Sequence, residues 1–159
     1  MSKITIGGIG FHVQQFNESA PESVIMIHGL GYGSLAVWYF KIAPVLAENF
    51  RVVMYDHKSH GLSDKTKSGY DLESMTNDLA ALMDNMGIEK TNFTGFSYGA
   101  LMALHFAIRF PERVHKLALV ESPDPGDKNE DAFAYASGNQ IKISDEMRNI
   151  LFPENILEI

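Results

Sequence analysis

The chain has 159 residues, of which 45% are hydrophobic and 21% charged, as expected for one globular domain that buries a sizeable core. Its formal net charge is −7 and its basic residues are scattered, which argues against nucleic acid as a partner. It has no cysteine, so disulfides, thiolate metal sites and a cysteine nucleophile are excluded. Residues 1–8 lack the apolar run of a signal peptide, and no window reaches the length of a membrane span. We therefore expect a cytoplasmic protein with no membrane contact.

The first part of the chain predicts a hairpin and then a buried strand. Ile4 and Ile6 alternate with polar residues, and two glycines lead into a second run at 11–16, a pattern typical of an antiparallel hairpin. Residues 24–27 are continuously apolar, which indicates a strand covered on both faces at the centre of a parallel sheet. A glycine-rich loop follows at 28–34.

The next segment predicts a helix and a second strand of the same sheet. Apolar residues at helical spacing favour a helix over 38–46, with a kink or a restart near Ala43 because Pro44 interrupts the helical hydrogen bonding. Residues 51–55 predict the strand, and the loop after it runs over 56–64.

A longer helix is indicated after residue 71. Asp71 is the expected N-cap, and Gly87 is the expected C-terminal stop. The apolar positions between them step by threes and fours along one face, which predicts core packing and no cofactor-binding surface. These positions are Leu72, Met75, Leu79, Leu82, Met83 and Met86.

The region after residue 90 continues the alternation of strand and helix. Residues 91–94 predict a strand, the following helix ends at Phe110 before a proline, and 114–120 predict another strand. The alternation predicts an α/β fold with a mostly parallel sheet and helices on both faces. Beyond residue 121 the chain is polar and rich in turn residues, with a weak helix expected over 144–152.

Ser97 lies in the sequence Gly95-Phe96-Ser97-Tyr98-Gly99, which fits the pattern G-x-S-x-G between a predicted strand and a predicted helix. At such an abrupt turn the apex residue has a strained backbone, and only small residues on either side let strand and helix approach. The hydroxyl is then held at a helix N-terminus, where N–H groups favour developing negative charge. The pattern predicts that Ser97 is a nucleophile.

Taken together, the motifs resemble the α/β-hydrolase fold family in its single-domain form with a lid. Four motifs carry the resemblance in the right order: His28-Gly29, the loop 56–64, which is similar to D-x-R-G-H-G-x-S-D, the serine turn, and residues 110–114. The resemblance implies that 1–123 are the N-terminal part of an α/β-hydrolase core. It implies that 124–159 begin an incomplete lid, and that the C-terminal strands and final helix of the family are lacking.

The same resemblance implies roles for backbone groups near Ser97. In this family the oxyanion hole is formed by the N–H after the nucleophile and by one in the loop after the third strand, here those of Tyr98 and Leu30. Glycines in that loop allow the backbone to approach a substrate. The residues expected to support the site are His28, Gly29, Gly95 and Gly99.

The acid and the base of the family's triad are missing from the sequence. The order is Ser, then Asp or Glu, then His, and the histidines after Ser97 are His105, expected on a helix face, and His115, expected at the sheet end opposite the nucleophile. We therefore expect an incomplete gene product, or half of an assembly. The open apolar edge of the strand at 114–120 favours self-association.

Three further observations leave alternatives open. His28 and His60 are expected to hold loop backbones by hydrogen bonds, although one of them could replace the missing base. His57 and His60 could form a metal pair, but no third ligand has convincing spacing, so neither a metal nor a cofactor is expected. Glu121 is either a polar strand end or the triad acid.

The expected function is that of a serine hydrolase acting on a carboxylic ester or a related small acyl compound through an acyl-enzyme at Ser97. A serine at this position argues against dehalogenase or epoxide hydrolase chemistry, which needs a carboxylate nucleophile. C–C bond hydrolysis, acyl transfer and aminopeptidase activity stay open within the fold. The alternative from another class is a non-catalytic ligand-binding or interaction protein that retains the serine turn.

Overall fold

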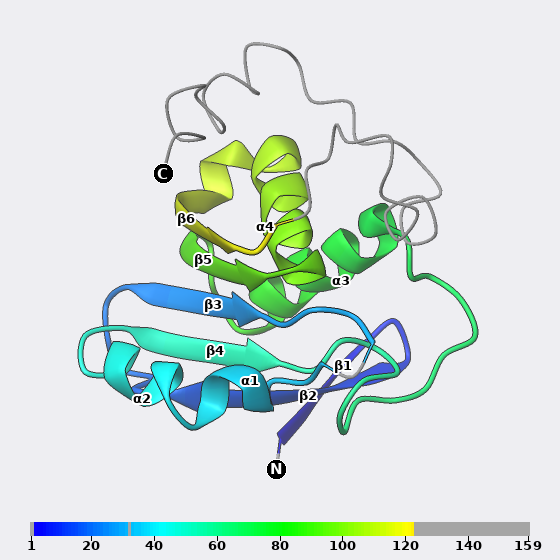
Figure 1. Cartoon of the computed structure of the whole chain (residues 1–159), viewed down its shortest axis with the longest axis horizontal. Helices are drawn as coiled ribbons and strands as arrows, with labels where there is room; N and C mark the ends of the chain where they lie inside the picture. The colour runs from blue at the N-terminus through cyan, green and yellow to red at the C-terminus, as the bar shows by residue number, and fades with distance from the viewer. Residues whose placement is uncertain (1, 32, 123–159) are drawn as a thin grey trace.

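The computed structural model describes residues 2–31 and 33–122, which form one six-stranded sheet flanked by helices (Figure 1). In chain order the strands are Ser2–Ile6 (β1), Ile9–Phe16 (β2), Ser23–Ile27 (β3), Arg51–Tyr55 (β4), Thr91–Phe96 (β5) and Val114–Val120 (β6). Across the sheet the order is β1-β2-β4-β3-β5-β6. The pairs β1–β2 and β2–β4 are antiparallel, and β4, β3, β5 and β6 are mutually parallel, which confirms the hairpin and the mostly parallel sheet.

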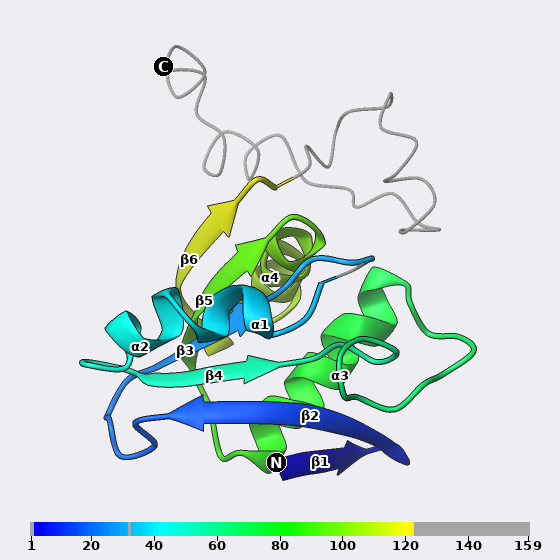
Figure 2. The same ribbon diagram turned by 60° about the horizontal axis from the view of Figure 1, so that its bottom comes forward.

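Helices cover both faces of the sheet, as the sequence predicts. The helices are Ala36–Tyr39 (α1), Ile42–Leu46 (α2), Leu72–Asn85 (α3) and Tyr98–Arg109 (α4), with a short 3-10 turn at Pro111–Arg113 (η1). The short helices α1 and α2 lie on one face and the longer α3 and α4 on the other (Figure 2). None of the described helices is long and apolar enough to cross a membrane.

The helix expected over 38–46 is two short helices, and the second begins at Ile42, next to Ala43, which confirms the predicted restart. The break falls at Phe40 and Lys41, between α1 and α2. A proline ring clashes with the carbonyl four residues earlier and supplies no N–H for it. For Pro44 that carbonyl belongs to Phe40, so the interruption appears one turn before the proline.

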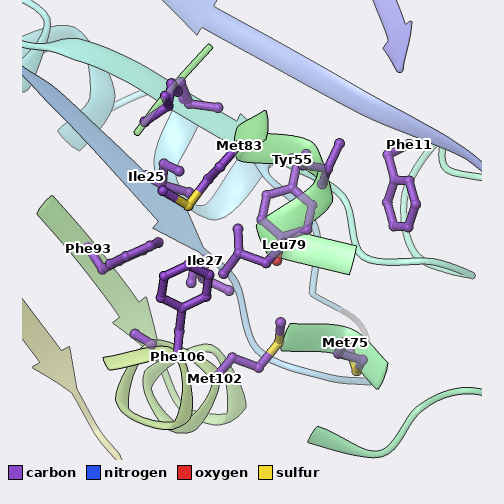
Figure 3. Packing of buried hydrophobic residues seen from close by; sticks show 14 of the residues in the cluster. Phe11, Ile25, Ile27, Tyr55, Met75, Leu79, Met83, Phe93, Met102 and Phe106 are labelled. Atoms are coloured by element: carbon purple, nitrogen blue, oxygen red, sulfur yellow. The ribbon is translucent and has the colours of Figure 1, made fainter. Parts of the chain in front are cut away.

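The main core lies between the sheet and the face of α3 and α4 (Figure 3). The predicted stripe of α3 supplies buried Met75, Leu79 and Met83, which confirms its core role. Asp71 caps the helix by accepting from the Ser74 N–H at 2.8 Å, and Gly87 follows its end with φ of 66°.

A second cluster packs α1 and α2 against the opposite face of the sheet. It includes Trp38 and Ala43 from the helices and Val24, Met26, Val52 and Met54 from β3 and β4. Every residue of β3 is buried. This confirms the expectation that the apolar run at 24–27 is covered on both faces at the centre of the parallel strands.

The strand β6 forms one edge of the described sheet, and its Val120 is 41% exposed. The predicted lid region at 124–159 and the weak helix at 144–152 lie outside the described residues. The proposal that the β6 edge recruits a second chain stays a prediction.

We predict that Gly99→Ala is far more destabilising than a glycine replacement made in open space. A Cβ at Gly99 would lie 2.7 Å from the His28 carbonyl oxygen and collide with that of Ile27. The free energy of unfolding should fall by roughly 3 kcal/mol, measured by urea denaturation. The matched control is Gly87→Ala, where φ is 66° but a Cβ meets no atom within 4 Å. Gly87→Ala should lower the free energy of unfolding by about 1 kcal/mol. Equal losses in the two variants would contradict the close approach of α4 to the end of β3.

Candidate active site

Ser97 is the residue at which β5 turns directly into α4. It has φ of 54° and ψ of −122°, a conformation that non-glycine residues rarely adopt, as expected for the apex of such a turn. Its N–H donates to the Val120 carbonyl at 2.9 Å, which fastens the apex to the end of β6. The first N–H groups of a helix have no acceptor within the helix. In α4 the first two are those of Tyr98 and Gly99, which directly follow Ser97.

Two glycines make the turn sterically possible. A Cβ at Gly95 would lie 2.5 Å from the Cα of Ala100, and one at Gly99 would strike the carbonyls at the end of β3. Strand β5 and helix α4 therefore meet backbone to backbone, with β3 directly beside them. This confirms the reason given for small residues on either side of Ser97.

The loop after β3 lies against the serine. A Cβ at Gly29 would be 3.3 Å from the Cβ of Ser97, so only hydrogen occupies the space between them. Leu30 follows at once and is half-buried. The side chain of Tyr98 is buried and its hydroxyl donates to the Tyr70 carbonyl at 3.0 Å. Gly29 thus lies against Ser97, with Leu30 next in the loop, and Tyr98 directly follows Ser97 in the chain.

His28 and His57 fasten this loop to the end of β4 through reciprocal hydrogen bonds. The His57 N–H donates to Nε2 of His28 at 3.1 Å, and Nε2 of His57 donates to the His28 carbonyl at 2.7 Å. Since Nε2 of His28 accepts, its proton lies on Nδ1, which donates to the Gly29 carbonyl at 2.6 Å. These bonds confirm that His28 holds loop backbone, and they occupy both of its ring nitrogens.

Both buried rings are held in the neutral form. Burial lowers the pKa of His28 from its ordinary 6.5 to about 4. Burial also lowers the pKa of His57, and the neighbouring His28 lowers it further. The rings lie 4.1 Å apart between centroids, so two charges there would repel strongly.

His60 completes a cluster of three imidazoles but not a metal site. Its ring centroid lies 5.4 Å from that of His28, and its Nδ1 lies 3.0 Å from the Lys58 carbonyl oxygen. Within residues 2–31 and 33–122, no group of three or more His, Cys, Asp or Glu side chains could hold a metal ion. The contact with the Lys58 carbonyl is a contact with loop backbone, as the sequence predicts for His60.

The loop at 56–64 departs from the family pattern at two positions, and the sequence analysis missed the contacts made there. Lys58 replaces Arg and forms a largely buried ion pair with Asp78 of α3 at 2.6 Å. Ser59 replaces Gly yet keeps a left-handed φ of 63°. Its hydroxyl accepts from the Thr66 N–H at 2.9 Å, which helps to hold this conformation. Position-by-position reading of the motif would have drawn attention to both.

The remaining candidates lie in different places. His105 contacts the Thr76 hydroxyl at 2.9 Å between α4 and α3, and His115 is exposed near the start of β6, as expected for both. Glu121 is exposed, has φ of 48°, and directly follows Val120, whose carbonyl holds Ser97. Glu121 therefore directly follows the strand end to which the Ser97 N–H is bonded.

A family model described as the alpha/beta hydrolase fold matches residues 22–149 of this chain. The chain is also 35% identical over 100 residues to a protein of Pantoea ananatis named as the carbamate hydrolase RutD. That match covers 62% of this chain and 36% of the relative.

Solved structures of other proteins also superimpose on this chain. The enol-lactonase of Burkholderia xenovorans LB400 superimposes with a TM-score of 0.71 at 29% identity, over 76% of this chain and 46% of that one. A 2-hydroxy-6-oxo-6-phenylhexa-2,4-dienoate hydrolase of Rhodococcus gives 0.69 at 28% identity, over 80% and 47%. The chain spans about a third to a half of the length of these relatives.

We predict that the neutral histidines make the fold less stable in mild acid. Between pH 6.5 and about 4, an unfolded chain binds a proton at residue 28 that the folded protein does not bind. Stability should therefore fall as the pH drops through this window, with His28 contributing at most roughly 3 kcal/mol. Urea denaturation at stepped pH measures the slope.

His28→Asn keeps a donor for the Gly29 carbonyl and removes the titrating ring, so the slope in this window should become shallower. His115→Asn, at an exposed position of β6, is the control. An unchanged slope in His28→Asn would contradict the assignment.

Proposed function

The chain belongs to the α/β hydrolase fold family, and on that premise we propose that it is the nucleophile-bearing part of a serine hydrolase. Ser97 attacks the carbonyl carbon of an acyl substrate, and an ester bond forms between its Oγ and the acyl group as the leaving group departs. Water then hydrolyses this acyl-enzyme. The observation that carries the proposal is the strained apex of Ser97 at the start of α4.

The geometry supports backbone donors for the oxyanion. The N–H of Ser97 is already committed to Val120, so it is not a donor for substrate. The N–H of Tyr98 opens the helix, and the loop that carries Leu30 packs against Ser97 through Gly29. We assign the oxyanion hole to the N–H groups of Leu30 and Tyr98, each contributing about 3 kcal/mol to transition-state stabilisation.

In this proposal the proton acceptor is none of His12, His28 and His105. His28 uses both ring nitrogens to hold the loop, and His105 contacts Thr76 between two helices. His12 lies against Asp56 on β2, on the far side of β4 from the serine turn. The matched regions cover 36% and 46% of the lengths of two relatives.

For the substrate we propose a small carboxylic ester or a related acyl compound. The names of two relatives refer to a carbamate and to an enol-lactone, and both substrates carry a carbonyl bonded to a heteroatom. The name of a third refers to hydrolysis of a dienoate ketone, which keeps C–C bond hydrolysis as a second candidate. Acyl transfer to an acceptor other than water uses the same acyl-enzyme.

We predict that a fluorophosphonate probe modifies Ser97 in this chain, and that the reaction is slow because His12, His28 and His105 are engaged in other hydrogen bonds. Added imidazole supplies a proton acceptor in solution and should raise the rate of labelling about tenfold or more. Intact-mass measurement follows the reaction, and peptide mapping locates the modified residue.

Ser97→Ala is the control and should remain unlabelled with and without imidazole. Ser63→Ala tests specificity, because Ser63 is a buried serine that donates to the Asp56 carbonyl, and this variant should still be labelled at Ser97. The absence of Ser97-dependent labelling in both conditions would refute the hydrolase proposal and favour a non-catalytic binding protein.

A further inference from the structure

A groove of about 630 Å³ lies between β2 and α1, away from the serine turn. Its volume is in the range of small-molecule sites. Strands β4 and β3 separate β2 from β5, at whose end Ser97 lies, so the groove is a second feature of the fold. The residues that matter for its chemistry are His12, Gln14, Glu18, Tyr39 and Phe40.

The inner wall of the groove is a histidine backed by a buried carboxylate. His12 is 6% exposed, and its Nδ1 lies 2.8 Å from Oδ2 of Asp56. Asp56 also accepts the N–H groups of Leu35 and Leu62 at 2.8 and 2.9 Å, so it is bound as an acceptor and the Nδ1 proton of His12 points toward it. The other ring nitrogen, Nε2, accepts from the Gln14 amide nitrogen at 3.0 Å, so the amide oxygen of Gln14 is the acceptor that this pair offers to a ligand.

The outer wall combines a carboxylate with aromatic rings. Glu18 is exposed and lines the groove. Tyr39 packs on Phe16 and on Phe40, with ring centroids 5.1 Å apart in both pairs. Phe40 is 77% exposed, an unusual position for a large apolar ring, and it forms part of the groove wall.

We propose that this groove binds a small organic cation, an ammonium group attached to an apolar body. The ammonium donates to the amide oxygen of Gln14 and is attracted by Glu18. Asp56 holds the proton on Nδ1 of His12, so that Nε2 binds and orients the Gln14 amide. The apolar body lies against Tyr39 and Phe40, whose ring faces also attract a cation.

The charge distribution favours a cation over an anion. Among the described residues that line the groove, Glu18 is the one counted as charged in the formal net charge. The guanidinium of Arg51 is bonded to Gln15 and to the Met86 carbonyl at the end of α3, on the opposite face of the sheet. The net charge of −7 attracts cations to the protein as a whole.

The test uses 2-phenylethylamine as the probe and the full chain labelled with ¹⁵N. Titration should give saturable amide shifts at Gln14, Ala36 and Phe40, which weaken as salt is raised. The neutral 2-phenylethanol and the anionic 3-phenylpropanoate have the same apolar body. They should bind roughly threefold and tenfold more weakly than the amine, respectively.

Variants at two exposed positions of the outer wall separate the contribution of the carboxylate from that of the aromatic ring without disturbing the core. Glu18→Gln and Phe40→Ala should each weaken binding of the amine about threefold, whereas Glu22→Gln, a matched change at an exposed loop position, should leave it unchanged. Equal binding of the alcohol or the acid, equal binding by Glu18→Gln, or no saturable shift at the groove would overturn the proposal. None of these results depends on whether Ser97 is a nucleophile.

Discussion

The structure depends on a backbone contact with no side chains in it. Helix α4 starts so close to β3 and β5 that a single methyl group on Gly99 would collide with the carbonyls of Ile27 and His28. With the helix this near, the chain between Phe96 and Tyr98 has no room for an ordinary turn, and Ser97 takes φ of 54°. The strain of such a conformation, of order 1–3 kcal/mol, persists only because the surrounding core holds the helix in place. The core beneath α3 and α4 therefore fixes the position of the serine hydroxyl.

The groups around Ser97 are held by the same edge of the sheet. His57 at the end of β4 binds His28 at the end of β3, and Asp56 binds the Leu35 N–H beyond the glycine-rich loop. The Ser97 N–H binds the end of β6. The ends of β4, β3 and β6 thus position the loop and the apex, and the oxyanion hole proposed above requires such preorganisation. The buried imidazoles serve this purpose as neutral hydrogen-bonding groups, and this accounts for the acid sensitivity expected of the fold.

Much of this could be predicted from the sequence because the signals were local. The alternation of apolar strands and helical stripes gave the sheet, and Gly95 and Gly99 around Ser97 indicated the turn, since only a close approach needs glycine on both sides. Contacts between distant segments could not be predicted in this way. The bonds from His57 to His28 and from His12 to Asp56 join segments 29 and 44 residues apart, and no periodicity encodes them. The restart of the helix at Ile42, next to Ala43, could be predicted because a proline at 44 cannot bond to the Phe40 carbonyl one turn earlier.

The central claim is that packing imposes strain on residue 97, and two replacements of that residue test it. Glycine adopts φ of 54° freely whereas alanine does not, so Ser97→Gly should have a higher free energy of unfolding than Ser97→Ala. Glycine is also a better N-cap residue than alanine. The variants Asp71→Gly and Asp71→Ala measure this contribution at an N-cap with an ordinary φ of −68°. The account predicts that the advantage of glycine over alanine is larger at 97 than at 71 by about 1 kcal/mol or more in urea denaturation. The same advantage at both positions would contradict it.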